Sequence, residues 1–462
     1  MKKILLMLTA LLLASFVAAQ SDDELFGGDD DFFFEDIIEI SEDEEPLGDL
    51  EQGILFENGS VKIGGSLSAS ATVSTVLYQE DQTDFLKNLK ATTLLPSLGS
   101  SITIDARPNQ DLRLFSRFNI DYPFNGNVLK VKEMFTDFNT GDYVSFRFGL
   151  HTVTWGTGLF YSPVSDMINT SSIDPEHRDE QVDGSLNLRM LLNIPNTMNN
   201  LWFYVIPDSG TWQARDTAVA LKGEFVLGGW ELGAGTFYKY NTAPRVMLTA
   251  SGSIKSWALF GEAVYQYGSD REWIEKQSFK DKKSVFKATA GFMRSWDDPN
   301  IMLLAQYYYD GNDFDASTLT DCFFYLNNMD IVMSEYGTKG HNVALSLGFS
   351  KLFGNDDLSL SLFGLANFTK PGLIDPNDPT LNDTVAYLNA DGSGNGDQLR
   401  SGINEAIGYL KASPRGIFSL TLNYAFNKNT SMGFGPYITV SDWKKPPVVS
   451  LKISFSLGGG KY

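Results

Sequence analysis

The chain has 462 residues and a formal net charge of −21 at pH 7, but fifteen of its Asp and Glu residues lie in residues 22–51, which contain neither Lys nor Arg. Once these and the two positive charges of Lys2 and Lys3 are set aside, residues 53–462 carry only −8. The body has no basic stripe, which argues against nucleic acid as a partner, and the single cysteine, Cys322, excludes an intrachain disulfide and a zinc site built from cysteine pairs.

Residues 1–19 predict a cleaved signal peptide. Lys2 and Lys3 precede an apolar run over residues 4–17, and small residues at 17–19 suit a cleavage site. The run is shorter than the ~20 residues that a membrane-spanning helix needs. The sequence therefore predicts export rather than a helical anchor.

Residues 20–52 combine a high acidic charge with short Phe and Ile clusters. This composition predicts a disordered periplasmic leader, and a peptide that docks on a partner is the alternative. Residues 53–462 are expected to form one domain. They contain no apolar run long enough for a spanning helix, so a membrane location requires a β-barrel.

A period of two in hydrophobicity begins at Val61 and continues along the chain. Val343, Leu345 and Leu347, for example, alternate with small or polar residues. Successive side chains of a strand point to opposite faces, so this pattern predicts strands with one apolar face, paired through short turns as β-hairpins. We expect about eighteen strands (16–18), at 60–77, 97–107, 110–122, 128–139, 143–154, 184–194, 200–207, 214–227, 229–240, 244–255, 256–268, 283–296, 300–309, 341–352, 357–369, 416–427, 430–441 and 447–457.

The lengths of the connections sort by strand number. Connections after even-numbered strands are short, as at 141–142 and 427–429. Barrels of bacterial outer membranes have an even number of strands, short periplasmic turns and long outer loops. The sequence therefore predicts an all-β fold, a transmembrane antiparallel up-and-down β-barrel. The long connections, which all follow odd-numbered strands and are expected to be extracellular, are 78–96, 155–183, 269–282, 310–340 and 370–415.

Aromatic residues mark both ends of several strands. Trp230 and Trp257 begin strands that end near Tyr238 and Tyr265, and Trp296 lies at the short-turn end of its own strand. Such rings suit the two interfaces of a bilayer, with an apolar band ~25 Å tall between them. A large soluble β-sandwich with buried aromatic residues is the alternative.

The last strand predicts how the barrel closes. Its apolar stripe ends in Phe455 and Leu457, and we expect it to pair with the first strand near residues 61–73, so that no edge remains. Tyr462 falls on the opposite register from this stripe. The sequence predicts either a bulge over residues 458–460 or a free tail.

Charged residues of the strands fall on the face opposite the apolar stripe, which predicts that they face the lumen. On the lipid face an Arg or Lys would cost about 2–4 kcal/mol at mid-depth. Neighbouring arginines favour a basic strip that filters solutes by charge, and internal ion pairing that fills the lumen is the alternative. The lumen and constriction candidates are Arg113, Arg117, Arg147, Arg189, Lys222, Glu224, Glu262 and Glu133, with Lys62, Lys287 and Lys452 on the same face.

Residues 147–169, RFGLHTVTWGTGLFYSPVSDMIN, resemble a segment of the bacterial outer-membrane porin-like β-barrel family of Gram-negative and spirochaetal bacteria. In that family an Arg-x-Gly strand is followed by Trp-Gly and by an Asp-x-Ile-Asn turn. His151 stands where family members usually have Gln, and Thr170 where they often have Pro. The resemblance implies passage of small solutes across the outer membrane. The matching residues here are Arg147, Gly149, Trp155, Gly156, Asp166, Ile168 and Asn169.

Two long loops carry further expectations. For the loop 155–183 a solvated acidic segment is favoured over an inward-folded constriction or a metal site at His177. The loop 370–415 is expected to contain a short helix whose apolar face packs on the barrel, in the lumen or against another protomer. That face comprises Leu399, Ile403, Ala406, Ile407 and Leu410.

These features predict a porin-like outer-membrane channel that passes small polar solutes through a charged lumen. A surface-displayed barrel that binds or adheres through its long loops is the alternative, and a barrel enzyme centred on His151 is the third hypothesis. No His-Glu-x-x-His, Gly-x-Ser-x-Gly or phosphate-loop motif occurs, so we expect no catalysis, metal or cofactor. The expected partners are outer-membrane lipid, the barrel-insertion machinery and small solutes, and an oligomer is left open.

Overall fold

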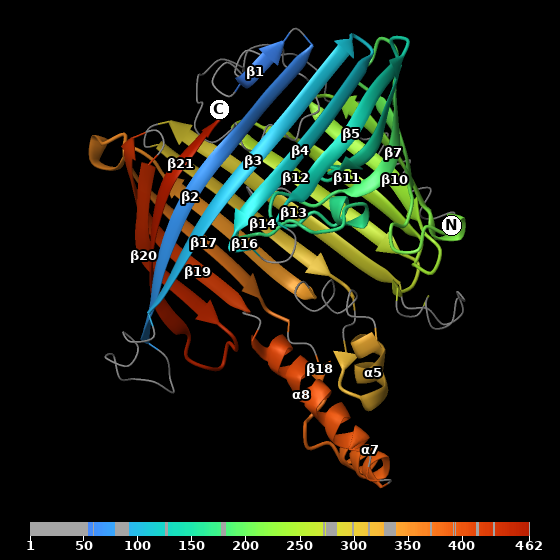
Figure 1. Cartoon of the computed structure of the whole chain (residues 1–462), viewed down its shortest axis with the longest axis vertical. Helices are drawn as coiled ribbons and strands as arrows, with labels where there is room; N and C mark the ends of the chain where they lie inside the picture. Colours follow the sequence, from blue (N-terminus) through green and yellow to red (C-terminus); the bar gives the residue numbers. More distant parts are fainter. Residues whose placement is uncertain are drawn as a thin grey trace.

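The computed structural model describes residues 54–58, 60–78, 92–124, 128–176, 182–270, 273, 284–297, 300–312, 315–327, 339–369, 372–390, 392, 394–412, 415–427 and 430–461. The predicted signal peptide and the acidic leader lie outside these residues. Figure 1 shows one tilted barrel of long strands, with helices beyond one of its ends.

The strands are β1 Ile54–Asn58, β2 Val61–Tyr78, β3 Thr93–Asn109, β4 Leu112–Tyr122, β5 Lys130–Thr140, β6 Val144–His151, β7 Ser185–Asn193, β8 Asn200–Ile206, β9 Ala218–Leu227, β10 Trp230–Tyr238, β11 Arg245–Ile254, β12 Trp257–Gln266, β13 Val285–Asp297, β14 Asn300–Asp310, β15 Asp315–Ala316, β16 Gly340–Phe349, β17 Leu358–Asn367, β18 Gly372–Leu373, β19 Gly416–Asn427, β20 Thr430–Val440 and β21 Val448–Lys461. The helices are α5 Leu319–Asn327, α7 Pro379–Asn389 and α8 Asn395–Ala412, with short 3-10 turns η2 Ser165–Met167, η3 Ala214–Asp216 and η4 Leu352–Gly354.

Eighteen antiparallel strands form the wall of a closed barrel. The main sheet has nineteen strands, of which β1 only extends the pairing of β2 at one end. Each remaining strand pairs with its neighbours along the chain, and β2 pairs with β21 to close the ring. The eighteen predicted strands are confirmed. β3 begins a few residues earlier than expected and β21 runs on to Lys461.

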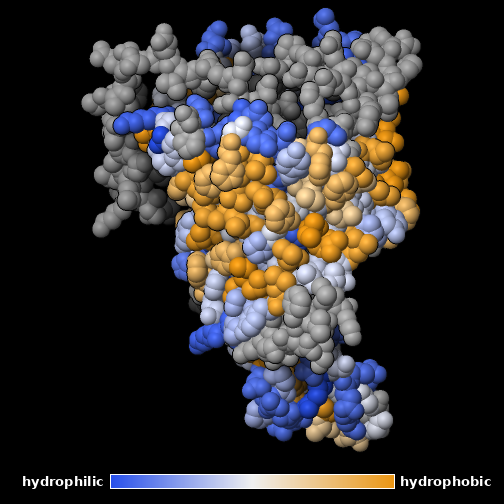
Figure 2. Space-filling view, turned by 90° about the vertical axis from the view of Figure 1, so that its left-hand side faces the viewer, coloured by the Kyte–Doolittle hydropathy of each residue, from blue (hydrophilic) through white to orange (hydrophobic). Residues whose placement is uncertain are grey.

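The outer surface of the barrel carries the apolar stripe of each strand. Large apolar side chains such as Leu67, Leu94, Leu420 and Phe455 remain exposed. Figure 2 shows hydrophobic residues gathered in a band across the middle of the face in view. Because hydrocarbon cannot hydrogen-bond to a backbone, a closed barrel with such a band is a structure that a bilayer accepts. This is a lipid-facing belt, and the soluble sandwich is excluded as a fold by the closure of the sheet.

The closing pair of strands settles the register of the chain end. Ala71 lies opposite Phe455 and Ala69 opposite Leu457, which keeps both aromatic and aliphatic side chains on the apolar face. Between Ser68 and Ser66 the register shifts, so that three steps along β21 match two along β2. One extra residue in one strand is a β-bulge. The bulge among the glycines is therefore found, and the free tail is wrong as far as Lys461; Tyr462 lies outside the described residues.

Two of the long loops form a helical unit beyond the barrel end (Figure 1). Ile403 and Ile407 of α8 pack in one cluster with Leu381 and Val385 of α7 and with Cys322 of α5. Residue pairs of β15 and β18 join the two loops in a short parallel ladder. The predicted helix is present, and its apolar face packs on the neighbouring loop helices rather than on the lumen. None of the described helices is long and apolar enough to cross a membrane.

A charge on the belt should destabilise the barrel much more than a charge on the opposite face of the same strand. We expect Leu420→Arg, near the middle of β19, to lower the free energy of folding into lipid vesicles by about 2–4 kcal/mol, because the guanidinium would lie in hydrocarbon. The matched control is Ser419→Arg, whose side chain points inward. Denaturant titration in vesicles measures both variants, and equal losses would contradict the assignment of the two faces.

Candidate functional site

The described residues of the segment between β6 and β7, 152–176 and 182–184, fold into the lumen. They are attached to the wall at β9, at β12 and β14, and at β20 and β21, strands that lie far apart around the ring. A segment with these attachments has to cross the interior. In the view of Figure 1 it lies within the outline of the barrel, whereas α5, α7 and α8 lie beyond the end.

A buried carboxylate on β12 holds the first turn of this loop. Glu262 accepts hydrogen bonds from the backbone N–H groups of Thr157 (2.6 Å) and Gly158 (2.5 Å), from Val164 N–H (3.0 Å) and from the Ser162 hydroxyl (3.0 Å). Its side chain is only 4% exposed. A carboxylate in a low-dielectric site needs such donors, and the donors of an irregular loop need such an acceptor. Glu262 and the loop therefore stabilise each other.

A second buried side chain, Gln306 of β14, holds the next residues. Its carbonyl oxygen accepts from the N–H groups of Leu159 (3.1 Å) and Phe160 (2.7 Å), and its amide donates to Tyr161 O (2.7 Å). Phe160 is fully buried in a cluster that includes Leu304. The two anchors together leave four consecutive backbone N–H groups, those of residues 157–160, satisfied by wall side chains.

The other side of the loop packs against an apolar part of the wall. Trp155 is 3% exposed, and its ring meets Tyr204 of β8 edge-on at 4.9 Å. Lys222 of β9, also buried, donates to Trp155 O at 2.6 Å and pairs with Glu224 at 2.5 Å. Of the predicted lumen residues, Lys222 thus contacts the loop directly, and Glu224 holds Lys222 in place.

Glycine is required where the loop approaches its acceptors. A Cβ on Gly156 would lie 1.9 Å from the Ser162 hydroxyl and 2.3 Å from Glu262 Oε1, and one on Gly158 would lie 2.0 Å from Tyr161 O. These contacts are well below any real Cβ distance, so a side chain at either position would displace the anchor. The Trp-Gly pair of the motif therefore has a steric explanation.

The second half of the motif closes the loop on itself. Asn169 donates to Val153 O and accepts from Val153 N–H, both at 2.8 Å, so that one side chain replaces a pair of backbone hydrogen bonds. Asp166, three residues earlier, lies in the buried interior near Glu262 and Asp310. Burial raises the pKa of the Asp166 carboxyl to about 8; the charge of Glu262 adds to this effect and Lys287 opposes it. The loop thus carries a carboxyl that is neutral at neutral pH.

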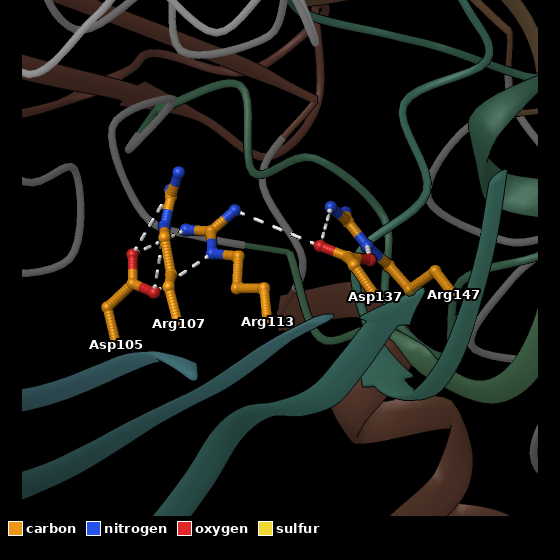
Figure 3. Close-up of polar contacts among 5 residues, drawn as sticks. All are labelled: Asp105, Arg107, Arg113, Asp137 and Arg147. Atoms are coloured by element: carbon orange, nitrogen blue, oxygen red, sulfur yellow. Dashed lines mark hydrogen bonds and ion pairs between the residues drawn. The ribbon is translucent and has the colours of Figure 1, made fainter. Parts of the chain in front are cut away.

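Along β3 to β6 the inner wall carries a row of alternating guanidinium and carboxylate groups. Arg113 contacts Asp105 at 3.0 Å and Asp137 at 3.9 Å, and Arg147 contacts Asp137 at 2.6 Å. Arg107 extends the row at 3.4 Å from Asp105. Figure 3 shows the five side chains in one line, with Arg113 between the two carboxylates. We call Asp105, Arg107, Arg113, Asp137 and Arg147 the charged row.

Two further predicted arginines flank the charged row. Arg117 lies 3.8 Å from Glu133 on β5. Arg189, opposite Arg147 in the β6–β7 ladder, is 6% exposed, and its guanidinium lies 5.3 Å from the centre of the Trp202 ring. Arg147 also covers Phe135 at 4.1 Å. These stacks hold the guanidinium groups along the wall and leave their edges for hydrogen bonding.

Small hydroxyl side chains line the wall next to the charged row. On β2, β3 and β21 the inward positions alternate with the apolar stripe and lie opposite one another, as in Ser70 with Ser97 and Thr72 with Ser454. Such side chains occupy little of the lumen. The inward hydroxyl residues of this wall include Ser66, Ser68, Ser70, Thr72, Ser97, Ser101, Ser454 and Ser456.

We call residues 174–183 the loop excursion. Two of its described residues, Glu176 and Asp183, contact this same part of the wall. Glu176 accepts a hydrogen bond from Tyr437 of β20 at 2.8 Å and lies 3.7 Å from Lys452 of β21. Asp183 lies 2.5 Å from Lys132 of β5. The wall between these attachments runs from β21 through β2, β3 and β4 to β5, and we call it the open arc. It contains both the hydroxyl side chains and most of the charged row.

The interpretation of the loop as a solvated acidic segment is wrong for its first half, because Phe160, Val164 and Ile168 are buried. His177 lies outside the described residues. His151 is 1% exposed against Phe135, and neither ring nitrogen has a hydrogen-bond partner among the described residues, so no described acid or nucleophile is paired with it. The described residues also contain no group of three His, Cys, Asp or Glu suited to a metal ion.

Sequence reasoning missed several residues of the site. Asp105 and Asp137 lie at inward-facing positions of predicted strands, so the alternation of inward and outward residues along a strand is enough to identify them. Gln306 is also on the inward register, but a neutral amide gives no charge signal. The sequence gives no signal for Ser162, because the role of this residue depends on the fold of the loop.

Comparisons with solved structures find outer-membrane porins. OpdL of Pseudomonas aeruginosa aligns over 87% of this chain and 99% of its own at 8% identity and a TM-score of 0.47. P. aeruginosa OccK2 (OpdF), solved with glucuronate, aligns over 89% and 100% at 9% identity and a TM-score of 0.48. A BenF-like porin of Pseudomonas fluorescens aligns over 86% and 98% at 6% identity and a TM-score of 0.46. No protein-family model matches the chain, and no curated protein matches it.

Loss of the Glu262 carboxylate should release the loop. In Glu262→Gln an amide NH₂ replaces one acceptor oxygen and faces backbone donors. A buried donor left without a partner costs ~1–3 kcal/mol, which raises the undocked fraction roughly tenfold or more. We expect larger current fluctuations in planar bilayers. Glu405→Gln on exposed α8 is the control, and a current trace identical to wild type in Glu262→Gln would contradict the anchor.

The docked loop should weaken as the pH rises. Asp166 keeps its proton in the docked loop up to about pH 8, whereas a solvated Asp loses it near 3.8. The docked state therefore binds more protons between these values, and its stability falls as pH rises through this window. We expect faster proteolysis of the loop at pH 8.5 than at pH 6.

Asp166→Asn should abolish that pH dependence, since an amide does not ionise. The control is Asp208→Asn in the β8–β9 loop. A hydrogen bond from Lys239 lowers the pKa of the Asp208 carboxyl, so its titration lies below the window tested. A pH dependence that survives in Asp166→Asn would show that another group is responsible.

Proposed function

We propose that this protein is an outer-membrane channel that passes small polar solutes along the open arc. The observation that carries the proposal is the loop anchored inside a closed barrel, with its excursion attached at β20/β21 and β5. A lumen that is filled by the loop on one side and lined by short hydroxyl side chains on the other leaves a narrowed passage between them. Narrowing of this kind is what a selective pore requires.

The charges along the passage support a preference for anions or for polar solutes with a dipole. Among the charged row and its flanking residues, five arginines (107, 113, 117, 147 and 189) stand against three carboxylates (105, 133 and 137), a net charge of +2 for this group. The ion pairs keep the guanidinium groups ordered and moderate the field, so the expected selectivity is weak rather than strict. The acidic loop excursion, with Asp174 and Glu176, supplies the opposite pole of a transverse field.

Single-channel recording of the purified, refolded protein tests the proposal. We expect discrete conductance steps and a reversal potential shifted toward the anion under a KCl gradient. Arg117→Glu brings the wall charge from +2 to 0, so its reversal potential should move toward that of the cation.

Lys351→Glu, at the periplasmic β16–β17 turn, is the matched charge change outside the lumen and should leave the reversal potential unaltered. No shift in Arg117→Glu would contradict the basic strip. A folded barrel without conductance would contradict the channel itself.

The helical unit formed by α5, α7 and α8 favours a second candidate function, display of a binding surface outside the cell. Its cluster of buried side chains makes it a folded unit rather than a set of slack loops. Tyr387, on α7, is 79% exposed there. The two functions are compatible in one molecule, and conductance separates a channel that also displays this unit from a barrel that only displays it.

A further inference from the structure

Arg294 lies on the lipid-facing side of the barrel. It follows Phe286, Ala288, Ala290 and Phe292 on the outward register of β13, whereas Lys287 and Thr289 point inward. Phe286 is 47% exposed and Val285 only 2%, which fixes the two faces. The charged strand residues that were assigned to the lumen above all lie on the inner face of the wall. Arg294 is therefore a cation in the belt.

The guanidinium is placed near the periplasmic edge of the belt by two tryptophans. It lies 4.9 Å from the centre of the Trp257 ring and 4.7 Å from that of Trp296. The two rings meet edge-on at 6.0 Å. Arg294 stands three residues before the end of β13 at the short turn to β14, about 10 Å along the strand and less along the membrane normal, because barrel strands are tilted. This is the depth of lipid headgroups and the upper acyl chains.

No described carboxylate forms an ion pair with Arg294. Its Nε is buried without a hydrogen-bond partner among the described residues. Its neighbour across the β14 ladder is Leu303. The wall arginines inside the lumen differ, since Arg113 and Arg147 each have carboxylate partners at 3.0 Å or less. Since no described residue supplies an anion to this arginine, the surrounding lipid is the source that its place on the outer surface offers.

The geometry points to a binding site for the phosphate of a phospholipid in the periplasmic leaflet, an inference that rests on the proposed membrane location. A guanidinium presents a rigid fork of N–H donors that matches two phosphate oxygens. The tryptophan faces stabilise the cation and offer apolar surface to the glycerol and upper acyl chain. The same arrangement explains why an arginine is tolerated where a leucine would suit the belt.

The site predicts a lipid that remains bound when the barrel is extracted. Native mass spectrometry of the refolded protein, titrated with phosphatidylglycerol in detergent, should show one tightly held lipid on the wild type. In Arg294→Gln its affinity should fall about tenfold or more, because a charge-assisted hydrogen bond contributes ~1.5–3 kcal/mol. Arg294→Lys, which keeps the charge but not the fork, should lie between the two.

Three comparisons make the test specific. A glucosyl diacylglycerol, which has no phosphate, should bind wild type and Arg294→Gln equally. Glycerol phosphate without acyl chains should not displace the lipid. Lys351→Gln, which removes a cation of another short turn that pairs with Asp356 at 3.3 Å, should bind phosphatidylglycerol as the wild type does.

Equal phosphatidylglycerol affinity in wild type and Arg294→Gln would overturn the site, as would displacement by glycerol phosphate alone. Arg294→Gln removes an unpaired charge and should fold, which heat-dependent gel mobility checks. Its conductance should equal that of the wild type, since the residue is outside the lumen. A barrel that fails to conduct but binds lipid through Arg294 would contradict the channel and leave the lipid site standing.

Discussion

Closure of the sheet is the constraint on which the rest of this structure depends. Hydrocarbon offers no hydrogen-bond partner, so each strand of the belt needs a neighbour on both sides, and the β2–β21 ladder supplies the last one. Closure fixes the register around the whole ring, and the register decides which side chains face lipid and which face the lumen. The bulge near the end of β21 follows from this constraint. It keeps the last residues of β21 paired with β2 although β21 has one residue more than β2 over this stretch.

A ring of eighteen strands encloses more space than wall side chains can fill, so part of the chain can fold inside it. An irregular segment in that position brings backbone donors into a region where water is restricted. The structure meets this with two wall residues, Glu262 and Gln306, which take four consecutive N–H groups between them. The loop in turn requires glycine at positions 156 and 158, because a side chain at either position would occupy the space of the acceptor atoms. The anchor thus determines which side of the lumen the loop fills.

The strands were predictable from the sequence because their pattern is local. Alternation of apolar and small or polar residues needs only the period of a strand, and all eighteen strands follow from it, as do the short turns. The register of inward charges follows in the same way. The position of the loop does not, because it depends on contacts between residues some 100 to 150 apart, such as Ser162 with Glu262 and Phe160 with Gln306. Its acidic composition favoured a solvated loop, but Asp166 at its centre is half-buried with one carboxyl oxygen out of contact with solvent, and burial raises its pKa to about 8.

The arginines of this barrel show how one side chain serves two surroundings. In the lumen, Arg113 pairs with Asp105 and Asp137 and Arg147 pairs with Asp137, so their charge is partly neutralised and their positions are fixed. In the proposed channel, a solute that enters the open arc would meet ordered donors rather than mobile cations, and it would exchange its water for them without disturbing the wall. Arg294 on the belt has tryptophan rings in place of carboxylates. Cation–π contact stabilises a guanidinium but leaves its in-plane donors unused, so this arginine still needs an anion from outside the chain. The difference follows from the register alone. A shift of one position along a strand moves an arginine from the inner face, beside the charged row, to the outer face, beside the lipid headgroups.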